Sequence, residues 1–463
     1  MNLAPDYERP QAPVAQDWPQ FESHTEQRRF GEKLPPWREF ILDKRLQTVI
    51  ALGLERSRSL RSTALNVERA RALYGVQRSA LFPSIAARAN ENAQREAQTV
   101  SQDGRATTSR QYTVQLAMTS YELDFFGRVR NLSEQALQSY LQSEDALKTA
   151  RSTLIAEIAI AWLRLGADRT SLALEREILR NQEEGFELMR SRYEHGTADR
   201  LEYEQARSTV EAARASIASY ERAVAQDRNA LELLTGGEVD ETLLPQTLEL
   251  KATLAAALPP GTPSEILVHR PDIQRAERQI LSANAQIGAA RAAFFPSVTL
   301  SAGAGTTAMT LSDLFDGGSG MWTFVPNINL PIFSGGRNVA NLKSAEVAQK
   351  IAVSDYEAAI QTAFREVADA LATEDTIVSE VNARTRYADS TRAAFVISEE
   401  SYKAGTVSYT DVLTQQRAMV AAQQTLITAQ LSMASSAVTL WKALGGGTEL
   451  DESTEVATKG SEG

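Results

Sequence analysis

Two stretches of about 65 residues without a proline constrain the fold of this chain more than any other feature. They run from about Val129 to Tyr193 and from about Val339 to Tyr402. At 1.5 Å per residue, a helix of this length reaches about 100 Å, which exceeds the size of a compact domain. The apolar positions of the second stretch form a thin stripe that alanines interrupt, which is typical of helices packed side by side. The sequence therefore predicts long coiled helices and not a single globule.

The chain also contains the same large unit twice. "ALFPSI" (80–85) returns as "AFFPSV" (293–298), and "RYEHGT" (192–197) returns as "SYKAGT" (401–406). "NALELLTGG" at the end of the first unit returns as "LWKALGGG" in the second. The offsets all lie near 210 residues, far above the period of a solenoid or propeller. We interpret the chain as two tandem repeats, with "FPS" at the joint where a helix leads into a strand.

After this joint, the spacing of the apolar residues in each repeat changes from the helical period to a period of two. Apolar residues alternate with polar ones over 112–118 in the first repeat, and over 298–304 and 322–330 in the second. A period of two predicts strands with one apolar and one polar face. A weaker strand opens at Ile85, and polar, glycine-rich loops separate the strands. We therefore expect one hairpin in each repeat.

The expected organisation follows from these signals. A helix from about Leu46 ends before Pro83, because a proline inside a helix breaks it. The proline-rich start is expected to be an extended arm, with a disordered tail as the alternative. The expected segments are an arm (1–45), a first repeat (46–250) with hairpin 84–125 and helices 129–193 and 197–235, a second repeat (251–447) with helix 272–293, hairpin 297–333 and helices 338–402 and 406–444, and a flexible tail (448–463).

A turn connects the two long helices of each repeat. Gly196 and Gly405 supply the left-handed residue that ends a helix, and we expect Thr197 and Thr406 to cap the helix that follows.

Composition excludes several functions. The formal net charge is −11 with both signs interspersed, so no basic stripe points to nucleic acid. The absence of Cys and three scattered His argue against disulfides, thiol nucleophiles and the usual metal clusters. "GAGTT" lacks the Lys and the helix of a phosphate loop. We expect no enzyme activity, no catalytic residues, no cofactor and no bound metal.

The strands have the length that crosses a membrane in a tilted barrel, about 10 residues. Trp322, Phe324 and Tyr121 stand where interface aromatics are expected, and the polar face suits a water-filled lumen. A small soluble sheet with one wet face is the alternative. Four strands are too few to close a barrel, and open edges are not tolerated in lipid, so closure would require several copies of the chain.

Seven motifs resemble those of the TolC-like outer-membrane factors, and most closely the OprM-type lipoprotein branch of drug-efflux ducts. They cover nearly the whole chain in order: "APDYERP", "YELDFFGRVRN", "RPDIQRAE", "NAQIGAARAAFFPSVTL", "LPIFSGGRN", "AFREVADALA" and "KALGGG". The resemblance implies a mixed α/β membrane protein. It would form a homotrimer with a 12-stranded outer-membrane β-barrel that continues as a periplasmic α-helical barrel.

The resemblance also implies a function. The chain would be the passive exit duct of a tripartite multidrug efflux pump, in contact with outer-membrane lipid, a periplasmic adaptor and an inner-membrane pump of the RND type. A duct for type I protein secretion or metal export shares the fold and is one alternative. A soluble coiled-coil scaffold is an alternative from another class.

Members of this branch usually carry a lipid-modified Cys just ahead of the "PxYxxP" stretch, where this chain has Met1. We expect a native palmitoylated lipoprotein whose acylation site is replaced, with a natural member lacking the lipid as the alternative.

By resemblance, the last helical turn forms a periplasmic gate. Tyr402 and Tyr409 would make contacts between helices, Leu413 would form a hydrophobic collar, Asp411 a ring of carboxylates, and Arg417 ionic locks. Three carboxylates around a pore attract cations and raise one another's pKa. The alternative for Asp411 is a helix N-terminal charge favoured by the helix dipole.

Relatives commonly carry an Asp where this chain has Thr414, so we expect a weaker cation filter. The first-repeat turn would pair with the second or dock the adaptor, although each of its charges can equally be an ordinary surface charge. The expected tip and docking residues are Gly196, Thr197, Asp199, Glu202, Glu204, Arg207, Gly405 and Thr406.

Overall fold

The computed structural model describes residues 1–15, 18, 34–100, 104–249, 253–254 and 264–447. The expected C-terminal tail and part of the N-terminal arm lie outside these residues. The chain divides into two compact units. The first consists of residues 1–11, 65–144 and 275–357, and the second of residues 12–64, 145–274 and 358–463.

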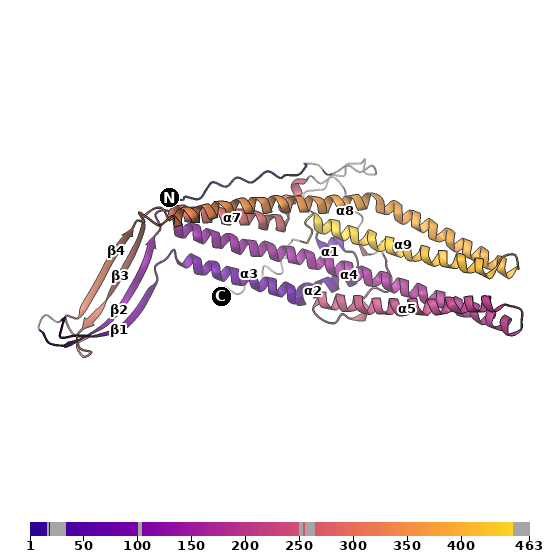
Figure 1. The fold of residues 1–463 in the computed structure, drawn as a ribbon, viewed down its shortest axis with the longest axis horizontal. Helices are drawn as coiled ribbons and strands as arrows, with labels where there is room; N and C mark the ends of the chain where they lie inside the picture. The colour runs from indigo at the N-terminus through magenta and orange to yellow at the C-terminus, as the bar shows by residue number, and fades with distance from the viewer. Residues whose placement is uncertain (16–17, 19–33, 101–103, 250–252, 255–263, 448–463) are drawn as a thin grey trace. The chain divides into compact units, whose positions relative to one another are not determined.

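The first unit contains an antiparallel sheet with the strand order β1-β2-β3-β4 (Figure 1). The strands are β1 (Ile85–Glu96), β2 (Thr107–Leu123), β3 (Ser297–Ala308) and β4 (Gly320–Asn329). Each repeat contributes one hairpin, and β2 pairs with β3 to join the two. In the part of the chain that the structure describes, β1 and β4 are the edges of the sheet.

The register places the apolar residues of the sheet on one face. Ala304 lies between Leu116 and Trp322, and Ala302 lies between Met118 and Phe324. The pairing shifts between Met118 and Tyr121, where Ser120 adopts a φ of 54°. This bulge adds one residue to β2, so Tyr121 returns to the apolar face, opposite Leu300. Trp322 is 78% exposed, so the described part of the chain leaves this apolar face largely open.

The two long helices of the chain are equal in length. Helix α4 (Arg128–Glu194) and helix α8 (Arg337–Lys403) each have 67 residues and begin 209 residues apart (337 minus 128). The partner helices are α5 (Arg200–Thr235) and α9 (Tyr409–Ala443), and α7 (Pro271–Ala292) precedes the second hairpin. Short 3-10 turns lie at η1 (Glu241–Leu243) and η2 (Ser264–His269).

The ends of α4, α5, α7, α8 and α9 lie within three residues of the bounds expected from the sequence. None of the described helices is long and apolar enough to pass through a membrane.

Two expectations at the start of the chain were wrong. The expected helix from Leu46 consists of α2 (Lys44–Arg56) and α3 (Arg58–Ser79), because Ser57 has a ψ of 123° outside the helical region. The expected arm also contains a short helix, α1 (Trp37–Phe40). Its Phe40 stacks on Trp441 with ring centroids 5.3 Å apart. This distant apolar partner draws the segment into the core of the second unit.

Candidate functional site

The two turns that connect the long helices are built in the same way. Gly196 and Gly405 have φ values of 74° and 76°. The N–H after each glycine donates to a carbonyl five residues earlier: Thr197 to Arg192 at 2.8 Å, and Thr406 to Ser401 at 3.0 Å. This left-handed helix ending satisfies the last carbonyls of α4 and α8.

The expected capping role of Thr197 and Thr406 was wrong. Their hydroxyls donate to the same carbonyls as their N–H groups, at 3.0 and 2.9 Å, so both residues close the preceding helix. Asp199 and Ser408 are the N-caps of the following helices. The Asp199 carboxylate accepts a hydrogen bond from the N–H of Glu202 at 2.7 Å.

Asp411 is tied to the start of its own helix. The Ser408 hydroxyl oxygen accepts from the Asp411 N–H at 3.2 Å, and the Asp411 carboxylate accepts from the Ser408 N–H at 3.0 Å. The Ser408 hydroxyl also donates to this carboxylate at 2.7 Å. These bonds from the Ser408 hydroxyl and N–H lower the pKa of Asp411. In this chain, Asp411 therefore acts as an ionised capping residue at the start of α9, as the alternative prediction for it states.

An arginine and two tyrosines link the two repeats beside these turns. Arg192 Nη1 of α4 donates to the Tyr402 hydroxyl of α8 at 2.6 Å, and its guanidinium lies 5.8 Å from the centre of the Tyr402 ring. The Tyr402 and Tyr409 rings are 5.4 Å apart. Burial, with smaller contributions from Tyr402 and Glu202, raises the pKa of Tyr409 to about 12. Tyr409 therefore remains neutral at physiological pH.

Sequence reasoning missed Arg192 and Gln205. Gln205 Oε1 accepts from the Thr410 hydroxyl at 3.4 Å, which gives a second link between the repeats. Arg192 belongs to the repeated "RYEHGT" motif, but its counterpart in the second repeat is Ser401. The only signal in the sequence was this difference: Arg192 is charged, whereas its counterpart Ser401 is small and polar.

The remaining predicted residues differ in exposure. Leu413 is 3% exposed, because Val412 and Leu413 form the buried side of the first turn of α9. The hydrophobic collar that Leu413 would form around a lumen stays a prediction of the sequence. Thr414 is exposed, and its hydroxyl donates to the Thr410 carbonyl at 2.8 Å.

The charged residues of the tip make few strong contacts. Arg417 is exposed, and no ion pair of the described residues includes it. Glu204 lies 3.9 Å from both Arg200 and Arg207. Exposed pairs at this distance contribute little stability, as expected for surface charges.

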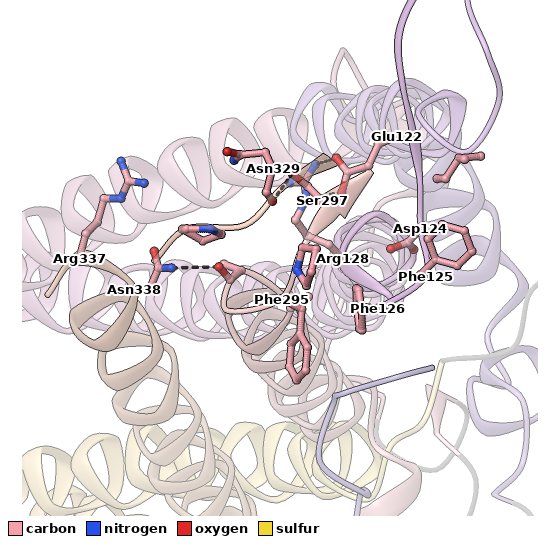
Figure 2. Close-up of a pocket in the computed structure, with 15 residues that line it drawn as sticks. Glu122, Asp124, Phe125, Phe126, Arg128, Phe295, Ser297, Asn329, Arg337 and Asn338 are labelled. Carbon is pink, nitrogen blue, oxygen red and sulfur yellow. Dashed lines mark hydrogen bonds and ion pairs between the residues drawn. The ribbon is translucent and has the colours of Figure 1, made fainter. Parts of the chain in front are cut away.

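A second cluster lies in the first unit, at the joints between helices and strands (Figure 2). The rings of Phe126 and Phe295 stack 4.7 Å apart, and Asn338 Nδ2 donates to the Ala293 carbonyl at 2.9 Å. Arg128 Nε donates to Glu122 at 2.8 Å. These contacts brace the joints around a cavity of about 300 Å³.

No group of three or more His, Asp or Glu side chains in the described ranges is arranged to hold a metal ion.

Comparison with known proteins assigns a family. The outer membrane efflux protein model matches residues 49–237 and 262–446. The toluene efflux pump outer membrane protein TtgF of Pseudomonas putida is 44% identical over 457 residues, which cover 96% of this chain and 94% of TtgF. The outer membrane protein OprJ of Pseudomonas aeruginosa is 41% identical, with 96% and 93% covered.

Solved structures of similar proteins support the same family assignment. A membrane protein from Pseudomonas aeruginosa has a TM-score of 0.91 at 40% identity, with 98% of this chain and 99% of that chain covered. The open state of the Neisseria gonorrhoeae MtrE outer membrane channel has a TM-score of 0.88 at 36% identity, with 97% and 99% covered. The chain therefore belongs to the outer membrane efflux protein family, whose members are channels and not enzymes, and it is an outer-membrane protein.

Proposed function

We propose that this protein is the exit duct of a tripartite multidrug efflux pump and that it conducts small toxic compounds passively. The observation that carries the proposal is the match along nearly the whole chain to proteins named as efflux pump outer membrane proteins. Among them, TtgF is named for toluene efflux and ArpC of Pseudomonas putida for antibiotic efflux. Family membership excludes the coiled-coil scaffold. A duct for protein secretion or metal export shares the fold, but the names of these relatives favour small toxic compounds.

The sheet supports an assembly of three copies. A strand edge in lipid leaves backbone N–H and C=O groups without partners, which costs several kcal/mol for each group. Pairing β4 of one copy with β1 of the next removes every edge, and three copies then form a twelve-stranded barrel. The long helices continue into the periplasm, where an adaptor and an inner-membrane pump of the RND type contact them. A lipid anchor near Met1 remains a prediction of the sequence.

The helical turns support a gate at the periplasmic end. The links from Arg192 to Tyr402 and from Thr410 to Gln205 join the two helical hairpins of one subunit and hold the gate closed. Three copies of Asp411 around the axis form an acidic ring. Because Ser408 keeps this carboxylate ionised, the ring attracts cations. Arg417 is exposed and available for an ion pair with a neighbouring subunit.

Channel recording combined with a cell assay tests this function. The purified protein in a planar bilayer should conduct ions, and its expression in a Gram-negative strain that lacks its own duct should lower the accumulation of a fluorescent efflux dye. The dye assay requires the matching pump and adaptor in the same cells. A protein that neither conducts ions nor changes dye accumulation would refute the proposal.

A further inference from the structure

The two hairpins of the sheet differ in charge. The β1–β2 hairpin contains Arg88, Arg95, Arg105 and Arg110, whereas residues 293–336, which include the β3–β4 hairpin, contain no Lys or Arg. The acidic residues of β1 are Glu91 and Glu96. A local excess of arginine on one hairpin of an acidic protein requires an explanation.

Contacts and register assign two of these arginines to the apolar face. Glu91 is paired with Tyr112, and its carboxylate accepts from the Tyr112 hydroxyl at 3.1 Å. Arg110 Nε lies 3.9 Å from the same carboxylate, so Arg110 shares this face. Side chains alternate along a strand, so Arg95, four residues after Glu91, also shares it. Arg95 is paired with Thr108, which makes it a diagonal neighbour of Arg110.

The other charged side chains of β1 point to the opposite face. Arg88 is paired with Gln115, and Glu96 is paired with Thr107. Both belong to the polar side of the sheet, because they alternate with Glu91 and Arg95 along the strand. Arg88 therefore provides a matched control on the same strand.

Arg95 and Arg110 lie at one end of the apolar stretch of the sheet, which we call the apolar band. The face remains apolar along β2 from Tyr121 through Met118, Leu116 and Val114 to Tyr112. At about 3.3 Å per residue and a tilt of about 40°, this stretch rises roughly 20 Å, close to the band of about 25 Å found in membrane barrels. Tyr121 and Tyr112 stand at its two ends. Arg110 and Arg95 lie beyond Tyr112, toward the connecting loop of the hairpin.

We propose that Arg95 and Arg110 bind the phosphate groups of the lipid in the outer leaflet of the outer membrane. This inference rests on the proposed function, because it requires that the apolar face contacts lipid and that the hairpin loops point outward. Guanidinium groups bind phosphate in a two-pronged fashion. The Arg110 side chain is 62% exposed, and Glu91 at 3.9 Å is too distant for a tight ion pair. The arginines follow directly after a lipid-facing band, which favours a lipid headgroup over a soluble anion.

Native mass spectrometry of the detergent-purified protein with bisphosphorylated lipid A tests the site. Loss of two charge-assisted contacts in R95Q/R110Q should weaken lipid A binding about tenfold or more. R88Q should bind like the unmodified protein, because Arg88 lies on the other face. E91Q should bind at least as well, since it removes a competing anion. Equal losses in R88Q and R95Q/R110Q, or equal binding of a phosphate-free glycolipid, would overturn the inference.

A measurement of channel conductance distinguishes a failure of the lipid site from a failure of the proposed duct function. The R95Q/R110Q changes lie on the face that contacts lipid, so they should leave assembly and conductance unchanged. If the unmodified protein does not conduct, the proposed duct itself fails. If R95Q/R110Q conducts normally and binds lipid A as well as the unmodified protein, only the lipid site fails.

Discussion

The helical parts of the two repeats share one backbone but differ in the side chains that it carries. Helices α4 and α8 have the same length, and the glycines that end their hairpin turns have almost the same φ. The next helix begins with Asp199 in the first repeat, and with Ser408 and a reciprocal bond to Asp411 in the second. The two turns therefore keep the same left-handed glycine, while the residues that cap the following helices differ.

Buried carboxyl groups show the same divergence. In the first repeat, Arg164 Nε lies 3.1 Å from Asp227 Oδ1, while the buried Oδ2 of Asp227 has no hydrogen-bond donor among the described residues. Burial, followed by a hydrogen bond that protonated Asp227 donates to Asp168 and by charge repulsion between the two carboxylates, raises the pKa of Asp227 to about 7, although the charge of Arg164 lowers it. The equivalent position in the second repeat is Ser436 (227 plus 209). That repeat instead has a half-buried Glu374, and the partial loss of solvent raises its pKa to about 7.

The largest expected effect is a loss of stability with rising pH. Because folding raises the pKa of Asp227 from 3.8 to about 7, its protonated form favours the folded state. This stability is present below about pH 4 and is lost as the pH rises through 7. Asp227→Asn should therefore increase hydrogen-exchange protection of α4 and α5 at pH 8 by a few kcal/mol and flatten its dependence on pH.

The second repeat provides the control for this experiment. In Asp227→Asn, α8 and α9 should keep the pH dependence that Glu374 causes, and Glu374→Gln should remove it. Protection factors of α4 and α5, corrected for the intrinsic rise of amide exchange with pH, that are the same at pH 5 and pH 8 in the unmodified protein would rule out the raised pKa of Asp227.

Tyr402→Phe should have the next largest effect. It removes the hydrogen bond from Arg192 while keeping the ring, and a partly exposed bond to a charged group contributes about 1–2 kcal/mol. The tip should open more often, and single-channel conductance should rise. Tyr193→Phe is the matched control, since Tyr193 is the counterpart of Tyr402 (402 minus 209) and its ring stacks 5.1 Å from Tyr203. Equal conductance changes in both variants would argue that the bond between Arg192 and Tyr402 does not hold the gate closed.

Gly196→Ala and Gly405→Ala should each cost about 1 kcal/mol, because both glycines have a left-handed φ that a Cβ disfavours. No described atom lies within 4 Å of a Cβ added at either position, so the cost is conformational. Hydrogen exchange at the ends of α4 and α8 measures it. Clearly unequal costs would mean that the two turns are not equivalent.

The smallest change in stability is expected for Ser408→Gly, about a few tenths of a kcal/mol, because glycine is tolerated at an N-cap. The variant removes the hydroxyl that lowers the pKa of Asp411, so this pKa should rise. Cation selectivity in a planar bilayer should then be lost at a higher pH than in the unmodified protein. Asp199→Gly should leave selectivity unchanged, and a shift of the same size in that variant would exclude Asp411 as the titrating group.

The sequence by itself determined the long helices, the strand alternation, the left-handed glycines and the family, because periodicity, turn chemistry and motif order are local or linear signals. Only the tertiary structure decided the pairing of Phe40 with Trp441, the contact between Arg192 and Tyr402, and the burial of Leu413. These depend on residues up to several hundred positions apart, and a local pattern carries no record of such partners. The role of Asp411 lies between these cases: its distance from Ser408 is short in sequence, but only the observed helix start showed that Ser408, and not Thr406, is the cap.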